Sequence, residues 1–427
     1  MISRGRTVHR AVGAAVAAVL AAGVPLGYAP SPAGAAVAGA SPASILDWDV
    51  AAETAIWDVA RQPPQIQSRG AAMVHGAIFD AVNAIAGRPY QPYLVAPPAD
   101  GSESVDAAVA TAAYQVLDSL FPAQHDDLRA RYDRSLAAVP DGPAERGGVA
   151  VGARAAAAMI DARRGDGSFG SQTFPVGTLP GQWRPTPPTY GNETAWVGRM
   201  KPFLLPRASM FRTAGPPALT SAQYARDYTE VKAVGSATST ARTADQTDAA
   251  IWWHDRRLAE WEIKRQLVTT QRLDVVRAAR MFAMADLAEV DAVIACFNEK
   301  AAWNRWRPVT AIRLGDTDGN PATAPDPNWT PLLVTPAHPD YTSGHTCDSG
   351  AVMSALAYFF GRDDIAFSAY SADSGSRRYF RGFTQALTEV TDARVWGGIH
   401  TRTADTQGAA IGLQTTAYMV AHYFRPA

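Results

Sequence analysis

The sequence has 427 residues, of which 47% are hydrophobic and 19% charged, and its formal net charge is −1. This is an ordinary globular composition, and a chain of this length can bury a large core. A nearly neutral chain has no general field that favours nucleic acid or an anionic membrane. Recognition of an anion must therefore be local.

The N-terminus has the pattern of an export signal. Arg4, Arg6 and Arg10 precede the apolar, alanine-rich run 11–29, and small residues surround Ala33-Gly-Ala35-Ala36. This order is typical of a signal peptide, here over residues 1–36. A retained membrane anchor is the less favoured interpretation. Alanine is only weakly hydrophobic, and Pro25 interrupts the apolar run. We expect a secreted protein, free of the membrane after cleavage, with residues 37–45 as a flexible leader.

Helical periodicity dominates the rest of the chain. Residues 164–220 are instead rich in Gly, Pro, Thr and Ser, and we expect long ordered loops over a bundle there. No alternating pattern longer than four residues predicts a strand, so the predicted fold class is all-α, a large helical bundle. It comprises an N-terminal half, 46–244, and a C-terminal half, 245–427. The predicted helices are 51–61, 70–86, 105–120, 149–163, 245–267, 273–304, 343–360, 383–396 and 403–424.

Three short segments of the C-terminal half carry a suggestive set of side chains. They are Lys300-Ala-Ala-Trp-Asn-Arg-Trp-Arg307-Pro308, Thr342-Ser343-Gly344-His345 and Arg394-Val-Trp-Gly-Gly398-Ile-His400. Burying three unpaired cations together would cost several kcal/mol each, so a fold that tolerates them usually binds an anion there. Ser343 and Gly344 begin a predicted helix, where free N–H groups attract negative charge. If the segments meet, they suit a tetrahedral oxyanion such as phosphate or vanadate.

Two cysteines, Cys296 and Cys347, lie beside these segments. Cys296 precedes Lys300 by four residues and therefore shares its helical face, and Cys347 follows His345 by two residues. Convergence of the segments would bring the sulfurs close to each other. Export would permit a disulfide, while a pair of buried thiols that act as small apolar residues is an equal alternative.

The three segments resemble the signature shared by vanadium-dependent haloperoxidases and type 2 phosphatidic-acid phosphatases. That signature reads Lys-x6-Arg-Pro, Pro-Ser-Gly-His, and Arg-x5-His within Ser-Arg-x5-His-x3-Asp. The likeness to the longer, soluble bacterial haloperoxidase-like proteins extends over nearly all of the chain after residue 36. It includes Ala72-Met-Val-His-Gly-Ala-Ile-Phe-Asp-Ala-Val-Asn83, Gly181-Gln-Trp-Arg-Pro-Thr-Pro-Pro188 and Arg242-Thr-Ala-Asp-Gln-Thr247.

The resemblance implies a role for each residue of the signature. Lys300, Arg307 and Arg394 would bind the equatorial oxygens of the anion, and Ser343 with the Gly344 amide would add hydrogen bonds. His345 would be the acid–base group near the apical oxygen. His400 would be the axial ligand of vanadium, or the nucleophile if the substrate is a phosphate ester. Imidazole titrates near neutrality and suits both roles.

Some positions depart from the family pattern. Thr342 replaces the proline of the second motif, and Ala393 stands where the phosphatases often have serine. Asp405 lies five residues after His400 rather than four, which leaves open whether it orients that imidazole. His338 occupies a position linked to halide preference and is a candidate neighbour of the site. Asp245 is a candidate buried partner of one arginine.

The first functional hypothesis is a vanadate-dependent haloperoxidase, in which hydrogen peroxide oxidises a halide to hypohalous acid or a halogenated organic product. Lys300 would polarise the peroxide, and His345 would carry protons. The alternatives are an exported acid phosphatase with a phosphohistidine intermediate, and a non-catalytic anion-binding protein. The expected partners are peroxide, halide and a small organic acceptor, without nucleic acid, and broad helical faces are compatible with a homodimer.

Overall fold

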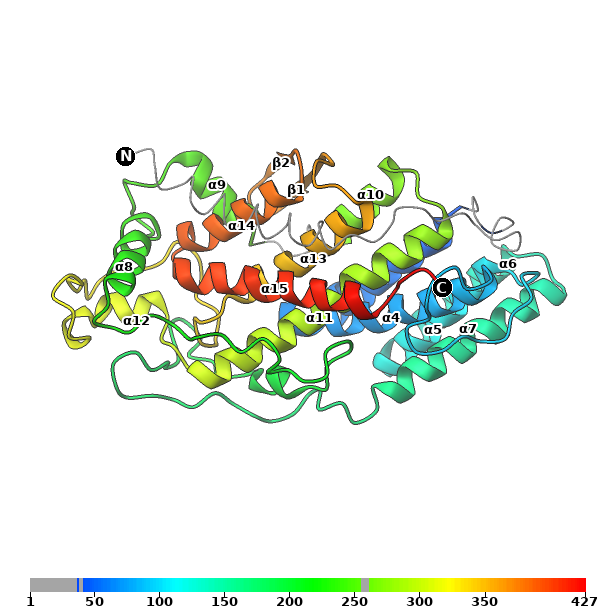
Figure 1. Cartoon of the computed structure of the whole chain (residues 1–427), viewed down its shortest axis with the longest axis horizontal. Helices are drawn as coiled ribbons and strands as arrows, with labels where there is room; N and C mark the ends of the chain where they lie inside the picture. The colour runs from blue at the N-terminus through cyan, green and yellow to red at the C-terminus, as the bar shows by residue number, and fades with distance from the viewer. Residues whose placement is uncertain (1–36, 38–40, 255–260) are drawn as a thin grey trace. The chain divides into compact units, whose positions relative to one another are not determined.

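The computed structural model describes residue 37 and residues 41–254 and 261–427 (Figure 1). The predicted signal peptide, residues 1–36, lies outside the described residues. The predicted leader is described only at 37 and 41–45, and its last residues already belong to the first described long helix, where Ile45 is buried. Within the described ranges, no helix combines the length and apolar character needed to cross a bilayer.

The described chain is mainly helical, which confirms the predicted class. Its α-helices are α3 (Ala43–Glu53), α4 (Pro64–Ile85), α5 (Val105–Leu120), α6 (His125–Ala137), α7 (Pro143–Ala162), α8 (Ala222–Val234), α9 (Ala244–Trp252), α10 (Ile263–Thr270), α11 (Val275–Trp303), α12 (Pro308–Arg313), α13 (Gly344–Phe360), α14 (Phe383–Trp396) and α15 (Arg402–His422). A π-helix, η1 (Thr54–Val59), continues α3, and short 3-10 turns lie at η2 (Pro122–Gln124), η3 (Ala195–Arg199) and η5 (Gly315–Thr317). Strands β1 (Phe367–Ser371) and β2 (Ser376–Phe380) form an antiparallel hairpin that pairs Phe367 with Phe380.

The chain divides into two compact units that interleave along the sequence. Unit 1 contains the described residues of Gly167–Leu258 and Asp291–Thr416. Unit 2 contains those of Gly23–Asp166, Ala259–Val290 and Ala417–Ala427. Helix α11 contributes residues to both units, so its C-terminal part, with Cys296 and Lys300, belongs to unit 1.

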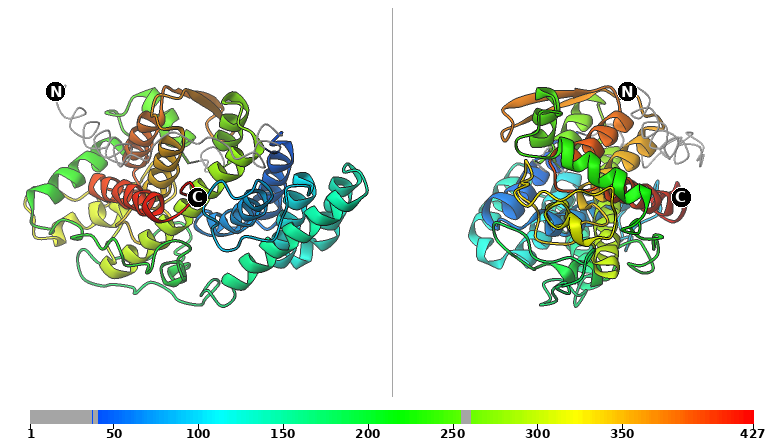
Figure 2. Two further views of the ribbon diagram at one scale, coloured as in Figure 1. Left: turned by 45° about the vertical axis from the view of Figure 1, so that its right-hand side comes forward. Right: turned by 90° about the vertical axis from the view of Figure 1, so that its left-hand side faces the viewer.

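Unit 2 is built around closely packed helices α4, α5 and α7 (Figure 1, Figure 2). Glycines let α7 approach α5, because a Cβ at Gly152 would lie 2.3 Å from the carbonyl oxygen of Ala108. Its centre also holds charge. His75 is fully buried and contacts the carboxylates of Asp49 and Asp286, and Asp286 also pairs with Lys264. This network pairs opposite charges inside the core, away from solvent.

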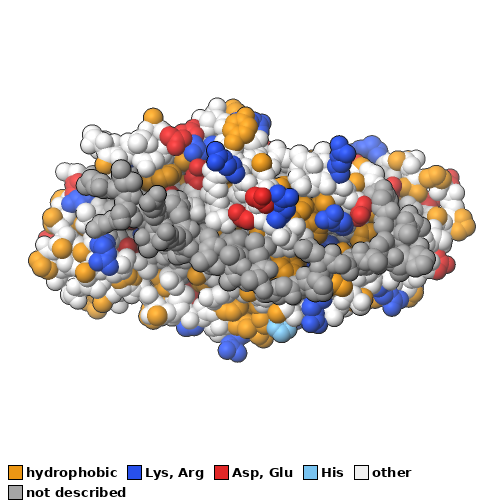
Figure 3. Space-filling model, turned by 45° about the horizontal axis from the view of Figure 1, so that its top comes forward, with side chains coloured by type: hydrophobic (Ala, Val, Ile, Leu, Met, Phe, Trp, Pro, Cys, Tyr) orange, Lys and Arg blue, Asp and Glu red, His pale blue; other side chains and the backbone are white. Residues whose placement is uncertain are grey.

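Unit 1 places the N-terminus of α13 against α15. A Cβ at Gly412 would lie 2.3 Å from the carbonyl oxygen of Cys347, and one at Gly408 would lie 2.3 Å from the Thr346 hydroxyl. Only glycine permits this approach, which brings the two helix starts together. Helix α14 packs on α13, α9 and α8, and α8 also packs on α12. On the face drawn in Figure 3, basic and acidic side chains lie interspersed with apolar ones.

The structure differs from the predicted elements in a few places. Helices α6, α8 and α12 and the β1–β2 hairpin were not predicted. The predicted helix 245–267 is divided, since α9 ends at Trp252 and α10 begins at Ile263, with residues 255–260 outside the description. The long loop segment is confirmed over 167–220 apart from the short turn η3.

Candidate active site

The junction between α11 and α12 positions two of the three cations. Lys300 lies in the last turn of α11, which ends at Trp303. Arg307 immediately precedes Pro308, and its backbone is extended, with φ −81° and ψ 158°. Proline disfavours helical geometry in the preceding residue and is well placed at the first position of a helix. The Lys-x6-Arg-Pro spacing therefore ends one helix and starts the next, with a cation on each side of the break.

The Gly181–Trp183 stretch holds this junction from outside the helices. The Trp183 amide donates to the carbonyl oxygen of Asn304 at 2.7 Å, and the Trp306 amide donates to Gly181 at 2.9 Å. Gly181 has φ +83°, a left-handed conformation that favours glycine. The segment that resembles the bacterial haloperoxidase-like proteins thus acts as a support for the chain between Lys300 and Arg307.

The N-terminus of α13 supplies the second segment. Ser343 occupies the N-cap position, but its hydroxyl makes no capping bond to its own helix. The buried Asp405 carboxyl lies beside that hydroxyl, and burial raises the pKa of Asp405 well above its usual range. His345, in the first turn of α13, is half-buried, whereas Ser343 is fully buried. His345 is therefore more open to incoming small molecules than Ser343.

The turn between α14 and α15 supplies the third segment. Arg394 lies in the last turn of α14, and His400 lies just before α15. Gly398 between them has φ +75°, and a Cβ there would lie 2.2 Å from the carbonyl oxygen of Gly235. Arg242 fixes the same region, because its guanidinium donates to the carbonyl oxygens of Ser236 at 2.8 Å and Trp396 at 3.3 Å.

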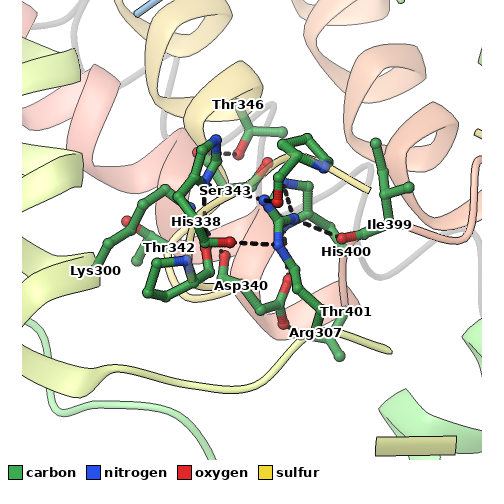
Figure 4. Close-up of polar contacts among 12 residues, drawn as sticks. Lys300, Arg307, His338, Asp340, Thr342, Ser343, Thr346, Ile399, His400 and Thr401 are labelled. Atoms are coloured by element: carbon green, nitrogen blue, oxygen red, sulfur yellow. Dashed lines mark hydrogen bonds and ion pairs between the residues drawn. The ribbon is translucent and has the colours of Figure 1, made fainter. Parts of the chain in front are cut away.

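The three segments converge around the Arg307 side chain (Figure 4). Its guanidinium donates to the carbonyl oxygens of His338 at 2.6 Å and Ile399 at 2.7 Å. It also lies 3.1 Å from His400 Nε2 and 3.0 Å from His338 Nδ1. These contacts bring together residues nearly a hundred positions apart in the sequence, and they include His338.

All three cations of the site are buried. Among the described residues, two of them have no close carboxylate partner. Lys300, Arg307 and Arg394 are each 0% exposed. The Lys300 ammonium donates to the carbonyl oxygens of Pro339 at 2.7 Å and Asp340 at 3.2 Å. Among the described residues, neither Lys300 nor Arg307 forms a salt bridge with a carboxylate. Burial, aided by Arg307, lowers the pKa of Lys300 to about 8, and burial lowers the pKa of Arg307 to about 10. A bound anion would compensate this charge.

The carboxylate beside His400 belongs to a residue that the sequence analysis did not select. His400 Nδ1 lies 2.6 Å from Asp340 Oδ1, and the Thr401 hydroxyl donates to Asp340 Oδ2 at 2.7 Å. Burial, reinforced by Arg307, Lys300 and Arg394, lowers the pKa of His400 well below its usual value. A neutral imidazole that donates Nδ1–H to Asp340 presents a lone pair on Nε2. That is the form needed for a metal ligand or a nucleophile.

Asp340 was not among the sequence-based candidates, and two of those candidates lie differently from expectation. Asp405 is buried beside Ser343 and Arg394 rather than hydrogen-bonded to His400. Asp245 is not a buried partner of the site, because its side chain is 75% exposed and pairs with Arg378 on β2. The only sequence signal for Asp340 is its position between His338 and Ser343, in a loop without periodicity.

The two cysteines are close to each other but not bonded. Both are fully buried thiols, so the disulfide considered as one alternative is not formed in this structure. Cys296 Sγ lies 3.1 Å from Thr342 Oγ1, and Cys347 Sγ lies 3.7 Å from the same oxygen. The threonine that replaces the motif proline therefore lies between the sulfurs and satisfies both.

The donor set fits vanadate or phosphate. Three buried cations, the Ser343 hydroxyl and the N-terminus of α13 are suited to a compact oxyanion, and the Nε2 lone pair of His400 is suited to an axial bond. Among the described residues, no group of three or more His, Cys, Asp or Glu side chains is arranged to hold a bare metal ion. The residues present are those that would hold the metal as its oxyanion.

Comparison with known proteins agrees with this geometry. The family model "VCPO second helical-bundle domain" matches residues 280–426, which include all three segments. This match supports the superfamily that the motifs resemble, that of the vanadium haloperoxidases and type 2 phosphatidic-acid phosphatases. Within this superfamily, the chain is 32% identical to the vanadium chloroperoxidase of Curvularia inaequalis over 117 residues. The aligned part is 25% of this chain and spans only 19% of that relative.

Solved structures of vanadium haloperoxidases resemble the chain over a greater length. A bacterial vanadium-dependent iodoperoxidase superposes with a TM-score of 0.75 and 25% identity, covering 90% of this chain and 98% of that chain. Apo and holo forms of a bacterial vanadium-dependent chloroperoxidase superpose with TM-scores of 0.67 and 0.66 at 18% identity. They cover 83% and 84% of this chain and 92% and 93% of their own. At that identity, the chloroperoxidase match supports the fold alone.

Proposed function

We propose that the protein is a vanadate-dependent haloperoxidase that uses hydrogen peroxide to oxidise a halide. The observation that carries the proposal is His400, which lies 2.6 Å from Asp340 and whose pKa is lowered by burial and by the charges of Arg307, Lys300 and Arg394. One matched structure, the bacterial iodoperoxidase at 25% identity, is itself named for halide chemistry. Bound vanadate would supply a Lewis acid that activates peroxide toward attack by halide.

The chain's own residues would perform binding, orientation and proton transfer. Lys300, Arg307 and Arg394 would hold the oxygens of the anion and stabilise negative charge as it shifts during the reaction. Asp340 would keep the Nε2 lone pair of His400 directed at the anion. His345, half-buried in the first turn of α13, would give and take protons at the bound oxyanion. The Ser343 hydroxyl and the Gly344 amide would complete the hydrogen bonds.

A phosphatase is the second candidate, and the His400–Asp340 pair favours it too. An imidazole held through Nδ1 by a carboxylate is suited to attack phosphorus through Nε2. Vanadate mimics the trigonal-bipyramidal transition state of phosphoryl transfer, so the same pocket suits both reactions. A protein that binds the anion without catalysis is the third alternative.

One assay separates the candidates. Anion-free protein would be loaded with orthovanadate and mixed with peroxide, a phenol dye and iodide, bromide or chloride in parallel. We expect dye halogenation that requires vanadate and is blocked by phosphate. Turnover of p-nitrophenyl phosphate that vanadate inhibits, without halogenation, would replace the proposal by the phosphatase. Phosphate binding without either activity would support the non-catalytic alternative.

We also propose that the protein is secreted, on the basis of the pattern in residues 1–36. Expression of the full chain in a bacterial host and N-terminal sequencing of the exported product tests this. We expect the mature chain to begin near residue 37. Retention of the full-length chain inside the cell would contradict it.

A further inference from the structure

Cys296 and Cys347 form an isolated dithiol at the wall of the oxyanion site. Cys296 lies on α11 one helical turn before Lys300, and Cys347 lies on α13 two residues after His345. Both sulfurs contact the Thr342 side chain, and Cys296 Sγ also donates to the Thr342 carbonyl oxygen at 3.4 Å. Thr342 directly precedes Ser343. The dithiol therefore lies immediately behind the loop that would contact the anion.

The two thiols differ in their electrostatic surroundings. Burial raises the pKa of Cys296, but a hydrogen bond with Cys347, the charge of Lys300 and the Thr342 hydroxyl lower it below its usual value. Burial and the neighbouring Cys296 raise the pKa of Cys347 well above its usual value. Cys296 is thus the nucleophilic member of the pair, and Cys347 keeps its proton.

Both cysteines are 0% exposed. A glutathione-sized disulfide cannot reach a sulfur in such a position, whereas hydrogen peroxide is not much larger than water. The inference that follows rests on the proposed function, because that function brings peroxide into the pocket beside Lys300. The pair is then a reducing group directly behind the Thr342–Ser343 loop, close to where the oxidant would be used.

We propose that Cys296 and Cys347 are a peroxide-reactive modification site whose oxidation to a disulfide weakens anion binding. The Cys296 thiolate attacks one peroxide oxygen, the O–O bond breaks, and the hydroxide released takes a proton to become water. Cys347 then attacks the sulfenic sulfur, the S–S bond forms, and a second water leaves with the Cys347 proton. Two thiols lose two electrons, and one peroxide is reduced to two waters.

The disulfide would act on the site through Thr342. Closing the bond between α11 and α13 removes the contacts of both sulfurs with the Thr342 hydroxyl, which lies between them. Displacement of Thr342 shifts Ser343, whose amide donates to the carbonyl oxygen of Ala404 at 3.0 Å and so fixes the start of α13 against α15. We expect affinity for a tetrahedral anion to fall by at least about tenfold, since the loss of one hydrogen bond to a charged group weakens binding by that order.

The test uses the full protein, reduced, desalted and free of vanadate and halide. Peroxide is titrated, thiols are counted after denaturation, and peptide mass mapping locates the crosslink. Because the sequence contains only 2 cysteines, the expected change is from two free thiols to none without chain dimers. Phosphate affinity is then measured by calorimetry, since phosphate does not react with thiols. We expect a loss of about tenfold or more that a reductant reverses.

Two variants separate the disulfide from general oxidation. Cys347→Ala and Cys296→Ala, each checked for native circular dichroism, should keep their phosphate affinity after the same exposure to peroxide. Persistence of both thiols in the wild type would overturn the proposal, and so would a disulfide that leaves phosphate affinity unchanged. If the reduced protein did not bind phosphate at all, the oxyanion site itself would be refuted, while the thiol count would still decide whether the pair reacts.

Discussion

The substitution Asp340→Asn separates the orientation of His400 from the positive charge of the pocket. Asp340 accepts from His400 Nδ1 at 2.6 Å and from the Thr401 hydroxyl at 2.7 Å. Asparagine can still accept from the imidazole and occupies nearly the same volume, but it carries no charge. The substitution therefore weakens the orientation and basicity of His400 while leaving the three cations in place.

The expected magnitudes follow from the surroundings of Asp340. Partners of metal-ligating histidines typically change metal affinity by about 10–100-fold, so vanadate affinity should fall by that factor. Inorganic phosphate is not coordinated by an imidazole nitrogen as vanadium is. Phosphate affinity should therefore stay the same or rise, because the substitution removes a nearby negative charge. Burial raises the pKa of Asp340 from 3.8 to about 6, which corresponds to about 3 kcal/mol against the ionised form. That cost to folding is present above pH 6 and vanishes below pH 4. At pH 7 asparagine removes the cost of burying the ionised carboxylate, so D340N should not lower the free energy of unfolding.

The assay is equilibrium dialysis with orthovanadate and, separately, with phosphate, together with urea unfolding at pH 7. Asp340→Ala is the matched comparison, because it leaves both donors unsatisfied and should cost about 2–4 kcal/mol of stability. An equal loss of vanadate and phosphate affinity in D340N would show that Asp340 shapes the pocket rather than orients His400. Unchanged vanadate affinity would refute the orienting role altogether.

Four further predictions concern the cations and the backbone around them. Raising the pH through about 8 should weaken phosphate binding by wild-type protein more than by Lys300→Met, because the Lys300 ammonium loses its charge; a parallel decline in both would contradict this. In the anion-free protein, wild-type stability should rise by about 3 kcal/mol relative to Lys300→Met between pH 8 and pH 10.5, since the unfolded chain binds the additional proton there, and urea unfolding across this range measures it. Arg394→Lys should reduce phosphate affinity about tenfold or more in calorimetry, because lysine cannot donate a planar pair of hydrogen bonds, and full retention of affinity would exclude a bidentate contact. Gly398→Ala should destabilise by at least about 3 kcal/mol, whereas Gly375→Ala, also at positive φ but with nothing within 4 Å of its Cβ, should cost only the backbone strain; equal effects in thermal unfolding would rule out the contact with Gly235.

Much of the architecture could be predicted because the signals are local. The bounds of α5 and α14 agree with those expected from apolar periodicity, and the Lys-x6-Arg-Pro break matches the end of α11. The site residues could be identified because each motif has fixed spacing around a helix end, where proline, serine or glycine sets the backbone. In the structure these residues lie close together, as the spacing predicted, while their roles stay predictions.

The features that the sequence did not predict depend on strands too short to show a pattern or on tertiary contacts. The strands of the β1–β2 hairpin have five residues each, which is too short for a periodic signal. Arg378 on β2 forms an ion pair with Asp245, which therefore does not contribute to the site. Asp340 and Thr342 act through tertiary contacts that no spacing rule describes. Asp405 could not be assigned because one extra residue in the first turn of α15 directs its carboxyl toward Ser343 instead of His400.

Vanadium K-edge X-ray absorption on the vanadate-loaded protein tests the central claim most directly. If the cationic pocket presents His400 Nε2 to the anion, the wild-type spectrum should require one imidazole nitrogen in the first coordination shell. The His400→Ala variant, loaded at a concentration that fills the pocket, should show oxygen neighbours alone. Identical oxygen-only spectra for both proteins would contradict the account.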